Sequence, residues 1–163
     1  MKYLITGSLL MLSILGWGCS SSSQKANAKQ PQAQSASADG GSGGLTPFQK
    51  KNGIGPITKE VKVGALDKEL AAKGKKIFDS KCSSCHKLGQ RYVGPDLKEV
   101  TSRRTPTYIM NMIMNPQGMT QKHPEARKLL QQFATQMANM HLKKDQARAV
   151  VEYFRSVNTN TAK

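Results

Sequence analysis

Apolar residues recur at helical spacing in two segments that flank a cysteine pair in the second half of the chain. Between Asp67 and Cys82 they fall on one face, and Asp67 is suited to cap the first turn of the helix. This stripe consists of Leu70, Ala71, Gly74, Ile77 and Phe78. The second stripe predicts a helix from about residue 143 to 157, and it consists of Ala147, Val150, Val151 and Phe154, with Tyr153 beside it.

A third apolar segment lies between these two. Thr105 and Pro106 have the types expected at an N-cap and a first helical position, and Asn115-Pro116 predicts the end of that helix. The segment is rich in methionine, which we interpret as core filling, at Met110, Met112, Met114 and Met119. Helical spacing does not place positions 110, 112 and 114 on one face, which argues against a Cu(I) site built from their thioethers. His123, which precedes a proline, is expected on the surface.

The N-terminus has the pattern of an export signal. A lysine at position 2 precedes an apolar run and then a cluster of small residues that ends at Cys19, so residues 1–18 are excluded from the fold. This segment resembles a bacterial lipoprotein signal, which implies that Cys19 is lipidated. Residues 19–44 are mostly Ser, Ala, Gln, Lys and Gly without apolar periodicity, and we expect a disordered linker. An unlipidated, cleaved form with an incidental cysteine is the alternative.

The 163-residue chain has a formal net charge of +15, and most of that charge lies after residue 44. No later segment is long and apolar enough to cross a bilayer, so a multispan membrane protein is excluded. Nucleic acid is an implausible partner, because the protein is predicted to be exported and has no basic motif interleaved with aromatic residues. A positive field of this size instead favours acidic protein partners. Contact with anionic lipid, or a face that serves solubility alone, is the alternative.

The chemical centre of the sequence is Cys82-Ser-Ser-Cys85-His86, the C-x-x-C-H pattern of c-type haem attachment. In that pattern both thiols bond to the haem and the histidine binds its iron. A structural zinc site would need four ligands, and the remaining cysteine belongs to the export signal. A thioredoxin-like pair would need a βαβ surrounding, whereas the flanks here are helical. We therefore predict one covalent haem c.

These residues resemble those of the class I cytochromes c, in which a helix carrying Gly and Phe before the haem motif crosses a C-terminal helix carrying an aromatic residue. The matching positions are Gly74, Phe78, Cys82, Cys85, His86 and Tyr153. The resemblance implies an all-α fold with 4–5 helices wrapped around one haem. It places the cytochrome domain at residues 65–163, preceded by an extension at 45–64 that either wraps the domain or lengthens the linker.

The same resemblance implies the remaining site residues. In Gly94-Pro95-Asp96-Leu97, the Pro95 carbonyl accepts the His86 Nδ1 hydrogen and Leu97 packs on the haem. Met137 is implied as the distal iron ligand, from the loop before the last helix. Ala138 stands where the family usually has proline, so Met140 stays open as an alternative, as do His141 and an open site.

His/Met ligation is typical of electron transfer rather than catalysis, so the predicted protein is not an enzyme. We expect an exported, periplasmic, lipid-anchored electron carrier between a quinol-oxidising complex and a terminal oxidase or reductase. A weaker resemblance, over residues 104–116 above all, is to lipoprotein cytochromes associated with nitrous oxide reductase systems. The alternatives are a gas or redox sensor or peroxidase-like enzyme with a labile sixth ligand, and a copper-handling accessory lipoprotein.

Overall fold

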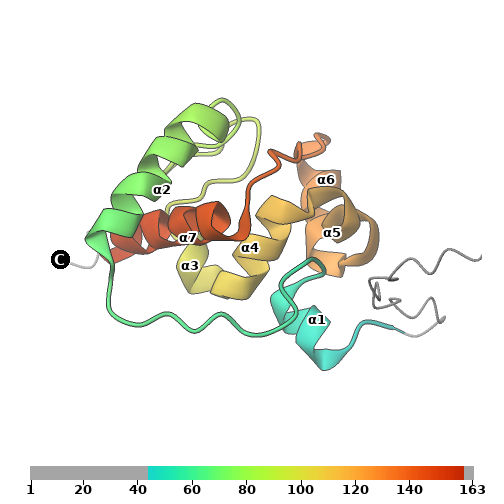
Figure 1. The fold of residues 1–163 in the computed structure, drawn as a ribbon. Coiled ribbons are helices and arrows are strands. Elements are labelled where there is room, and N and C mark those ends of the chain that lie inside the picture. Colours follow the sequence, from blue (N-terminus) through green and yellow to red (C-terminus); the bar gives the residue numbers. More distant parts are fainter. Residues whose placement is uncertain (1–43, 160–163) are drawn as a thin grey trace, which may run out of the picture. The chain divides into compact units, whose positions relative to one another are not determined.

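A computed structural model describes residues 44–159 as an all-helical domain, with seven helices and no strand in this range (Figure 1). The helices are α1 (Pro47–Asn52), α2 (Lys68–Lys81), α3 (Val100–Arg103), α4 (Pro106–Met114), α5 (Pro116–Lys122), α6 (Pro124–Phe133) and α7 (Lys144–Thr159). The all-α fold is confirmed, whereas the expected count of 4–5 helices was too low. The structure has more helices than expected because several of its helices are short.

Prolines explain the short helices. Pro47, Pro106, Pro116 and Pro124 each stand at the start of a helix. Proline suits the first helical position, but it disfavours the helical conformation in the residue before it. Residues 106–133 are therefore divided into α4, α5 and α6 instead of forming one long helix. The predicted cap is present, because the Thr105 hydroxyl accepts a hydrogen bond from the Tyr108 amide at 3.0 Å.

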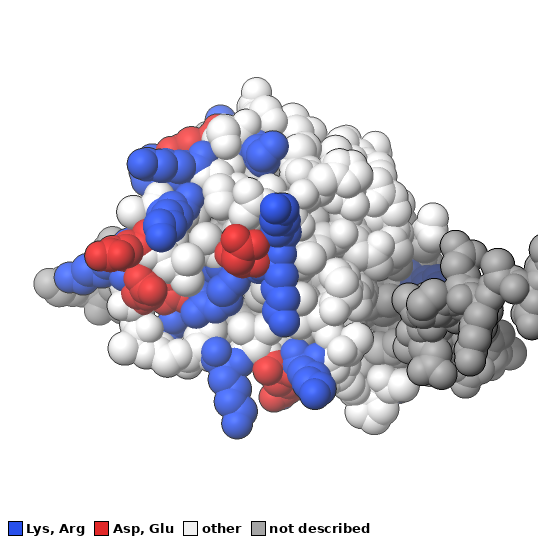
Figure 2. Space-filling view, in the orientation of Figure 1, with Lys and Arg blue, Asp and Glu red and all other residues white. Residues whose placement is uncertain are grey.

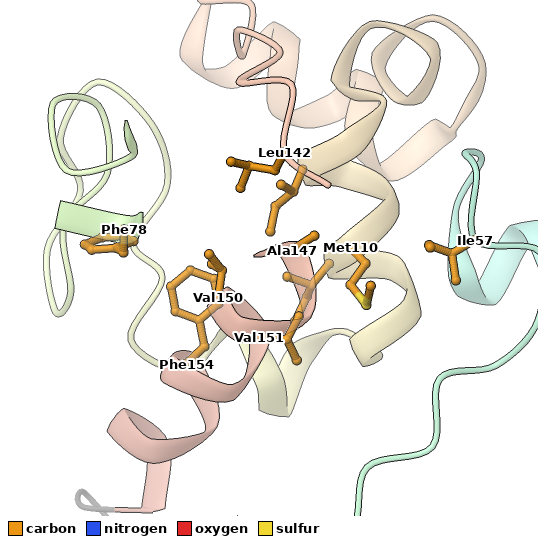
Figure 3. Packing of buried hydrophobic residues seen from close by; sticks show 10 residues of the cluster. Ile57, Phe78, Met110, Leu142, Ala147, Val150, Val151 and Phe154 are labelled. Atoms are coloured by element: carbon orange, nitrogen blue, oxygen red, sulfur yellow. The ribbon is translucent and has the colours of Figure 1, made fainter. Parts of the chain in front are cut away.

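The helices α2 and α7 cross closely, as the resemblance to the class I cytochromes c implied (Figure 1). Gly74 is buried at the crossing, where a Cβ atom would collide with the backbone carbonyl of Ala149. The Phe78 ring lies 5.5 Å from the Tyr153 ring and 5.7 Å from the Phe154 ring, measured between centroids. Figure 3 shows Phe78 facing the α7 side chains Val150 and Phe154 across this contact.

Residues 44–64 form a segment that we call the N-terminal strap. It consists of α1 and an extended run that leads to α2 (Figure 1). The Asn111 amide on α4 is the main anchor: Nδ2 donates to the carbonyls of Asn52 and Ile57, and Oδ1 accepts from the Ile57 amide, all at 3.0 Å. Ile57 belongs to the main hydrophobic core (Figure 3). Of the two roles considered for residues 45–64, this packing supports wrapping of the domain.

His123 is buried, which corrects the expectation of a surface position. Only 1% of the residue is exposed, and its Nε2 lies 3.1 Å from the Lys50 carbonyl of the strap. Its ring meets the Tyr108 ring edge to face, with centroids 5.2 Å apart. A polar residue before a proline usually marks an exposed turn, and here the strap covers that turn.

The predicted signal peptide at 1–18, Cys19 and the linker lie outside the described residues, except for Gly44. Within residues 44–159, no helix is long and apolar enough to span a membrane.

Candidate functional site

The domain contains an apolar cavity of about 290 Å³, enclosed by the segment after α2, by α4 and by the loop before α7. The described residues that were predicted to contact the haem line this cavity, except for the alternative ligand His141. These residues are Cys82, Cys85, His86, Pro95, Leu97, Met137 and Met140. They come from segments up to 58 positions apart in the sequence, and the fold brings them to one place.

The Cys-x-x-Cys-His segment continues the helical turn at the end of α2. The Cys82 amide donates to the Phe78 carbonyl at 2.8 Å, and the Cys82 carbonyl accepts from the amides of Cys85 and His86 at 3.1 and 2.9 Å. This turn places both sulfurs and the imidazole on the cavity wall. Both thiols are free, and burial raises the pKa of the Cys82 thiol.

His86 is buried and held in one orientation. Its Nδ1 lies 3.2 Å from the Pro95 carbonyl, so Nδ1–H donates there and the Nε2 lone pair stays available to a metal. Burial lowers the pKa of His86, and the hydrogen bond to Pro95 opposes this shift in part. Gly94 lets the loop approach the ring, because a Cβ atom there would lie 2.5 Å from His86 Cε1. The imidazole is thus favoured in its neutral, metal-binding form.

The loop between α6 and α7 carries both candidate methionines. It is bounded by two non-glycine residues in the left-handed region, Ala134 with φ 50° and His141 with φ 51°. Asn139 fastens it to α4 by donating to the Met114 carbonyl at 3.3 Å. Met137 and Met140 are both half-buried on the cavity wall. His141 is exposed and is not among the cavity-lining residues, which weakens its candidacy as a ligand.

Sequence reasoning missed a polar part of the cavity wall at α3 and α4. Tyr108 lines the cavity and is 4% exposed, and its hydroxyl has no hydrogen-bond partner among the described residues. Burial raises the pKa of Tyr108. Arg103 and Arg104 line the same cavity, and the Arg104 guanidinium lies 4.9 Å from the centre of the Tyr108 ring. The sequence showed these arginines only as part of the basic surface.

The residues present fit a covalently attached haem. The wall is apolar and carries two free thiols, an imidazole oriented by Pro95, two thioethers and a hydroxyl that has no partner among residues 44–159. A bare metal ion fits less well, because no three His, Cys, Asp or Glu side chains gather into a metal-binding group within residues 44–159. Met110 is fully buried in the core whereas Met112 lines the cavity, as expected for methionines on different helix faces.

Known proteins resemble this chain in sequence and fold. A family model for cytochrome c matches residues 71–158. A cytochrome c from Rhodothermus marinus is 43% identical, with a TM-score of 0.66, and the match covers 71% of this chain and 99% of that chain. An engineered cytochrome c from Rhodothermus marinus bound to a carbene intermediate, 1-ethoxy-1-oxopropan-2-ylidene, is 42% identical, with a TM-score of 0.64 and coverage of 71% and 100%. No match was found among curated proteins. The chain belongs to the cytochrome c family, whose members bind covalently attached haem c and use it for electron transfer.

Proposed function

We propose that this protein is an exported, lipid-tethered monohaem cytochrome c that carries single electrons between respiratory proteins. The observation that carries the proposal is the convergence of Cys82, Cys85, His86 and Met137 on one apolar cavity. The donor is proposed to be a quinol-oxidising complex. The acceptor is proposed to be a terminal oxidase or a terminal reductase such as nitrous oxide reductase.

Each side chain has a defined part in this proposal. The bound haem supplies an iron that accepts and releases one electron. Cys82 and Cys85 would hold the ring by thioether bonds, and His86, oriented by Pro95, would provide a nitrogen ligand to the iron. Met137 would provide a sulfur ligand. The apolar wall, which includes Leu97, excludes water, and together with the thioether ligand this favours a high reduction potential.

The distal ligand can be tested by visible spectroscopy of the haem-loaded domain with Met137→Ala and Met140→Ala. We expect the weak long-wavelength band of sulfur-to-iron ligation to disappear in Met137→Ala and to persist in Met140→Ala. The two variants serve as matched controls, because both residues are half-buried in the same loop. If the band disappears only in Met140→Ala, the sulfur ligand is Met140 and not Met137.

We propose that redox partners dock beside the haem through a basic surface. Figure 2 shows Lys and Arg gathered over the part of the molecule where α2 and α7 lie, whereas the part over α5 and α6 carries few charges in this view. Basic residues flank the haem motif in the sequence, and three of them, Lys81, Arg103 and Arg104, line the cavity. The others are Lys73, Lys75, Lys76, Lys87 and Arg91. Tyr92 and Val93 are 54% and 39% exposed, and Lys87 Nζ lies 5.1 Å from the Tyr92 ring centre. An apolar spot within a positive rim suits an acidic partner.

Small oxidants of opposite charge test this docking surface. The rate of oxidation by anionic hexacyanoferrate(III) should fall as salt is added, and the rate with cationic hexaammineruthenium(III) should rise. Lys87→Glu should slow oxidation by hexacyanoferrate(III) more than Lys50→Glu does. Lys50 is an exposed lysine on α1. Equal effects of the two variants would argue against a local docking site.

We propose that Cys19 anchors the protein to a bacterial membrane on the periplasmic side. Two or more acyl chains are enough for stable membrane residence. The test is membrane fractionation of cells that produce wild type or Cys19→Ser, with the mass of the mature N-terminus measured in parallel. Wild type is expected in the membrane fraction with added lipid mass, and Cys19→Ser is expected to be released. A wild-type protein without lipid mass would refute the anchor.

A labile sixth ligand, as in a sensor or an enzyme, is the second candidate. The observation that favours it is that an engineered relative, 42% identical, holds a carbene intermediate. Carbon monoxide distinguishes the candidates, because a stably ligated carrier binds it poorly. Rapid binding of carbon monoxide to the reduced wild-type protein would favour the second candidate.

A further inference from the structure

Arg91 joins two segments that contribute to the wall of the haem cavity. It belongs to the haem-motif segment, residues 82–97, which carries the Cys-x-x-Cys-His motif. Its Nη2 donates to the carbonyl of Gln132 at 3.1 Å, and its guanidinium carbon lies 4.3 Å from the centre of the Phe133 ring. Gln132 and Phe133 are the last two residues of α6, which ends just before the loop that carries Met137.

Both contacts suit a guanidinium at the end of a helix. The last four carbonyls of a helix have no partner within the helix, and partial negative charge gathers there. Arg91 satisfies one of these carbonyls, that of Gln132, and brings a positive charge to the C-terminus of α6. The contact with Phe133 adds a cation–π interaction. A lysine has no planar group that could stack on the ring while it donates to the carbonyl.

The loop after α6, residues 134–143, is called the ligand loop here because it carries both candidate methionines. It leaves α6 through Ala134, a non-glycine residue with φ 50°, a conformation that persists only where its surroundings hold it. Its Gln136 accepts from a hydroxyl on α5 at 2.9 Å, and its Asn139 donates to the last carbonyl of α4 at 3.3 Å. Within residues 44–159, the bond from Arg91 is the one hydrogen bond that links residues 124–143 to the haem-motif segment.

We propose that Arg91 is a positioning residue that fixes the start of the ligand loop against the haem-motif segment and so slows the departure of the methionine sulfur from the iron. This inference rests on the proposed function, because it requires a bound haem with a sulfur ligand. Met137 and Met140 both follow the fixed point, so it holds for either ligand. Arg91 is exposed, so its contact can open locally without unfolding of the domain. An open contact would give external ligands easier access to the iron.

The test is the rate at which imidazole displaces the sulfur ligand in the oxidised, haem-loaded protein. Imidazole is mostly neutral at about pH 8, so removal of a protein charge does not change its approach. At saturating imidazole the rate is set by the departure of the sulfur. Arg91→Gln should raise this limiting rate about fivefold, because one hydrogen bond and one exposed cation–π contact are lost.

Arg127→Gln is the matched control. Arg127 is also exposed, and it donates to a backbone carbonyl, that of Gln121, but it does not reach the haem-motif segment. Its substitution removes the same charge and should leave the limiting rate at the wild-type value. Arg91→Lys separates shape from charge, and it should raise the limiting rate as well, because an ammonium group cannot stack on Phe133 as a guanidinium does.

Hydrogen exchange measured by mass spectrometry gives a readout that does not depend on ligand binding. Backbone amides of residues 134–143 should exchange faster in haem-loaded Arg91→Gln than in wild type, whereas those of the N-terminal strap, residues 44–64, should not change. Faster exchange confined to the ligand loop would distinguish a local contact from a general loss of stability.

Covalent haem and the long-wavelength sulfur band are first confirmed in the wild-type protein, and their absence would refute the proposed function itself. With both present, three results would overturn the inference alone. They are an imidazole rate in Arg91→Gln that equals the wild-type rate or is matched by Arg127→Gln, full recovery of the wild-type rate in Arg91→Lys, and unchanged exchange in residues 134–143.

Discussion

Two glycines show how single positions build this site. Gly74 lets α2 approach the backbone of α7, and Gly94 lets its loop approach the imidazole of His86. Both approaches are set by the missing Cβ atom rather than by an unusual backbone conformation. The sequence suggested the role of Gly74, because it lies in an apolar stripe. It did not show the contact of Gly94 with the ring, which depends on where the loop returns.

Gly74→Ala is expected to destabilise the haem-loaded protein by about 2 kcal/mol. The helix propensity of alanine is more favourable than that of glycine by about 1 kcal/mol. However, the new methyl group meets a backbone carbonyl that no side-chain rotation can move, and overpacking of this kind costs up to about 3 kcal/mol. Denaturant unfolding measures the difference.

Gly64→Ala is the matched control, because nothing lies within 4 Å of a Cβ atom at that position. Equal stabilities for the two variants would mean that α2 and α7 do not meet as closely as described.

At the scale of the elements, local signals predicted some helices well. The Asp67 side chain accepts from the Leu70 amide at 2.9 Å, and the predicted last helix, about 143–157, is α7 at Lys144–Thr159. The strap was not predictable in the same way. It is bound by side chains such as Asn111, which lies 54 positions from its partner Ile57, and no local pattern indicates so distant a pairing.

Asn111→Ala is expected to loosen the strap and to cost about 3 kcal/mol. The change leaves the Ile57 amide and the carbonyls of Ile57 and Asn52 without their partner inside the protein. Limited proteolysis should then cut within residues 44–64 sooner than in wild type. Asn158→Ala removes hydrogen bonds to Thr101 and Ser102 instead and should leave the strap protected. A strap that stays resistant in Asn111→Ala would show that Asn111 is not its anchor.

Glu152 on α7 forms a hydrogen bond with the start of α2, and its ionisation makes the free energy of unfolding depend on pH. It is 0% exposed, and it accepts from the Asp67 amide at 3.0 Å, from Arg155 at 2.5 Å and from Arg148. Burial raises the pKa of Glu152, but the hydrogen bonds from Arg155, Asp67 and Arg148 outweigh it and hold that pKa below its usual 4.5. The stability it contributes is therefore present above about pH 4.5 and is lost as pH falls through the lower, folded-state pKa.

Glu152→Gln is accordingly expected to lower the free energy of unfolding near neutral pH and to reduce its decline in acid. Glu69→Gln changes an exposed position on α2, so its free energy of unfolding should vary with pH as that of wild type does. Unfolding measured from pH 7 downward checks both expectations. If the free energy of unfolding of Glu152→Gln falls in acid as steeply as that of wild type, other groups are responsible for the acid sensitivity.

At the scale of the whole molecule, the domain is built around a cavity rather than a closed core. The Cys-x-x-Cys-His motif is contiguous, so the sequence alone located the chemical centre. Tyr108, Arg103 and Arg104 could be assigned to the same cavity only once α3 and α4 were placed. In the sequence they read as ordinary members of a helix start and a basic surface, and only the fold shows that they line the cavity.

The domain should therefore depend on haem for its stability. A cavity of about 290 Å³, if left unfilled, costs at most about 7 kcal/mol at 24 cal/mol per Å³. This is comparable with the whole stability of a small domain, about 5–15 kcal/mol. The double variant Cys82→Ala, Cys85→Ala cannot form the thioether bonds, and we expect it to lose its cooperative thermal transition in circular dichroism. Cys19→Ser removes a thiol but leaves the cavity cysteines in place, so it should keep the wild-type transition. If the haem-free double variant unfolded cooperatively at the wild-type temperature, the protein core alone would be sufficient, and the cavity would be a binding site that the fold does not need.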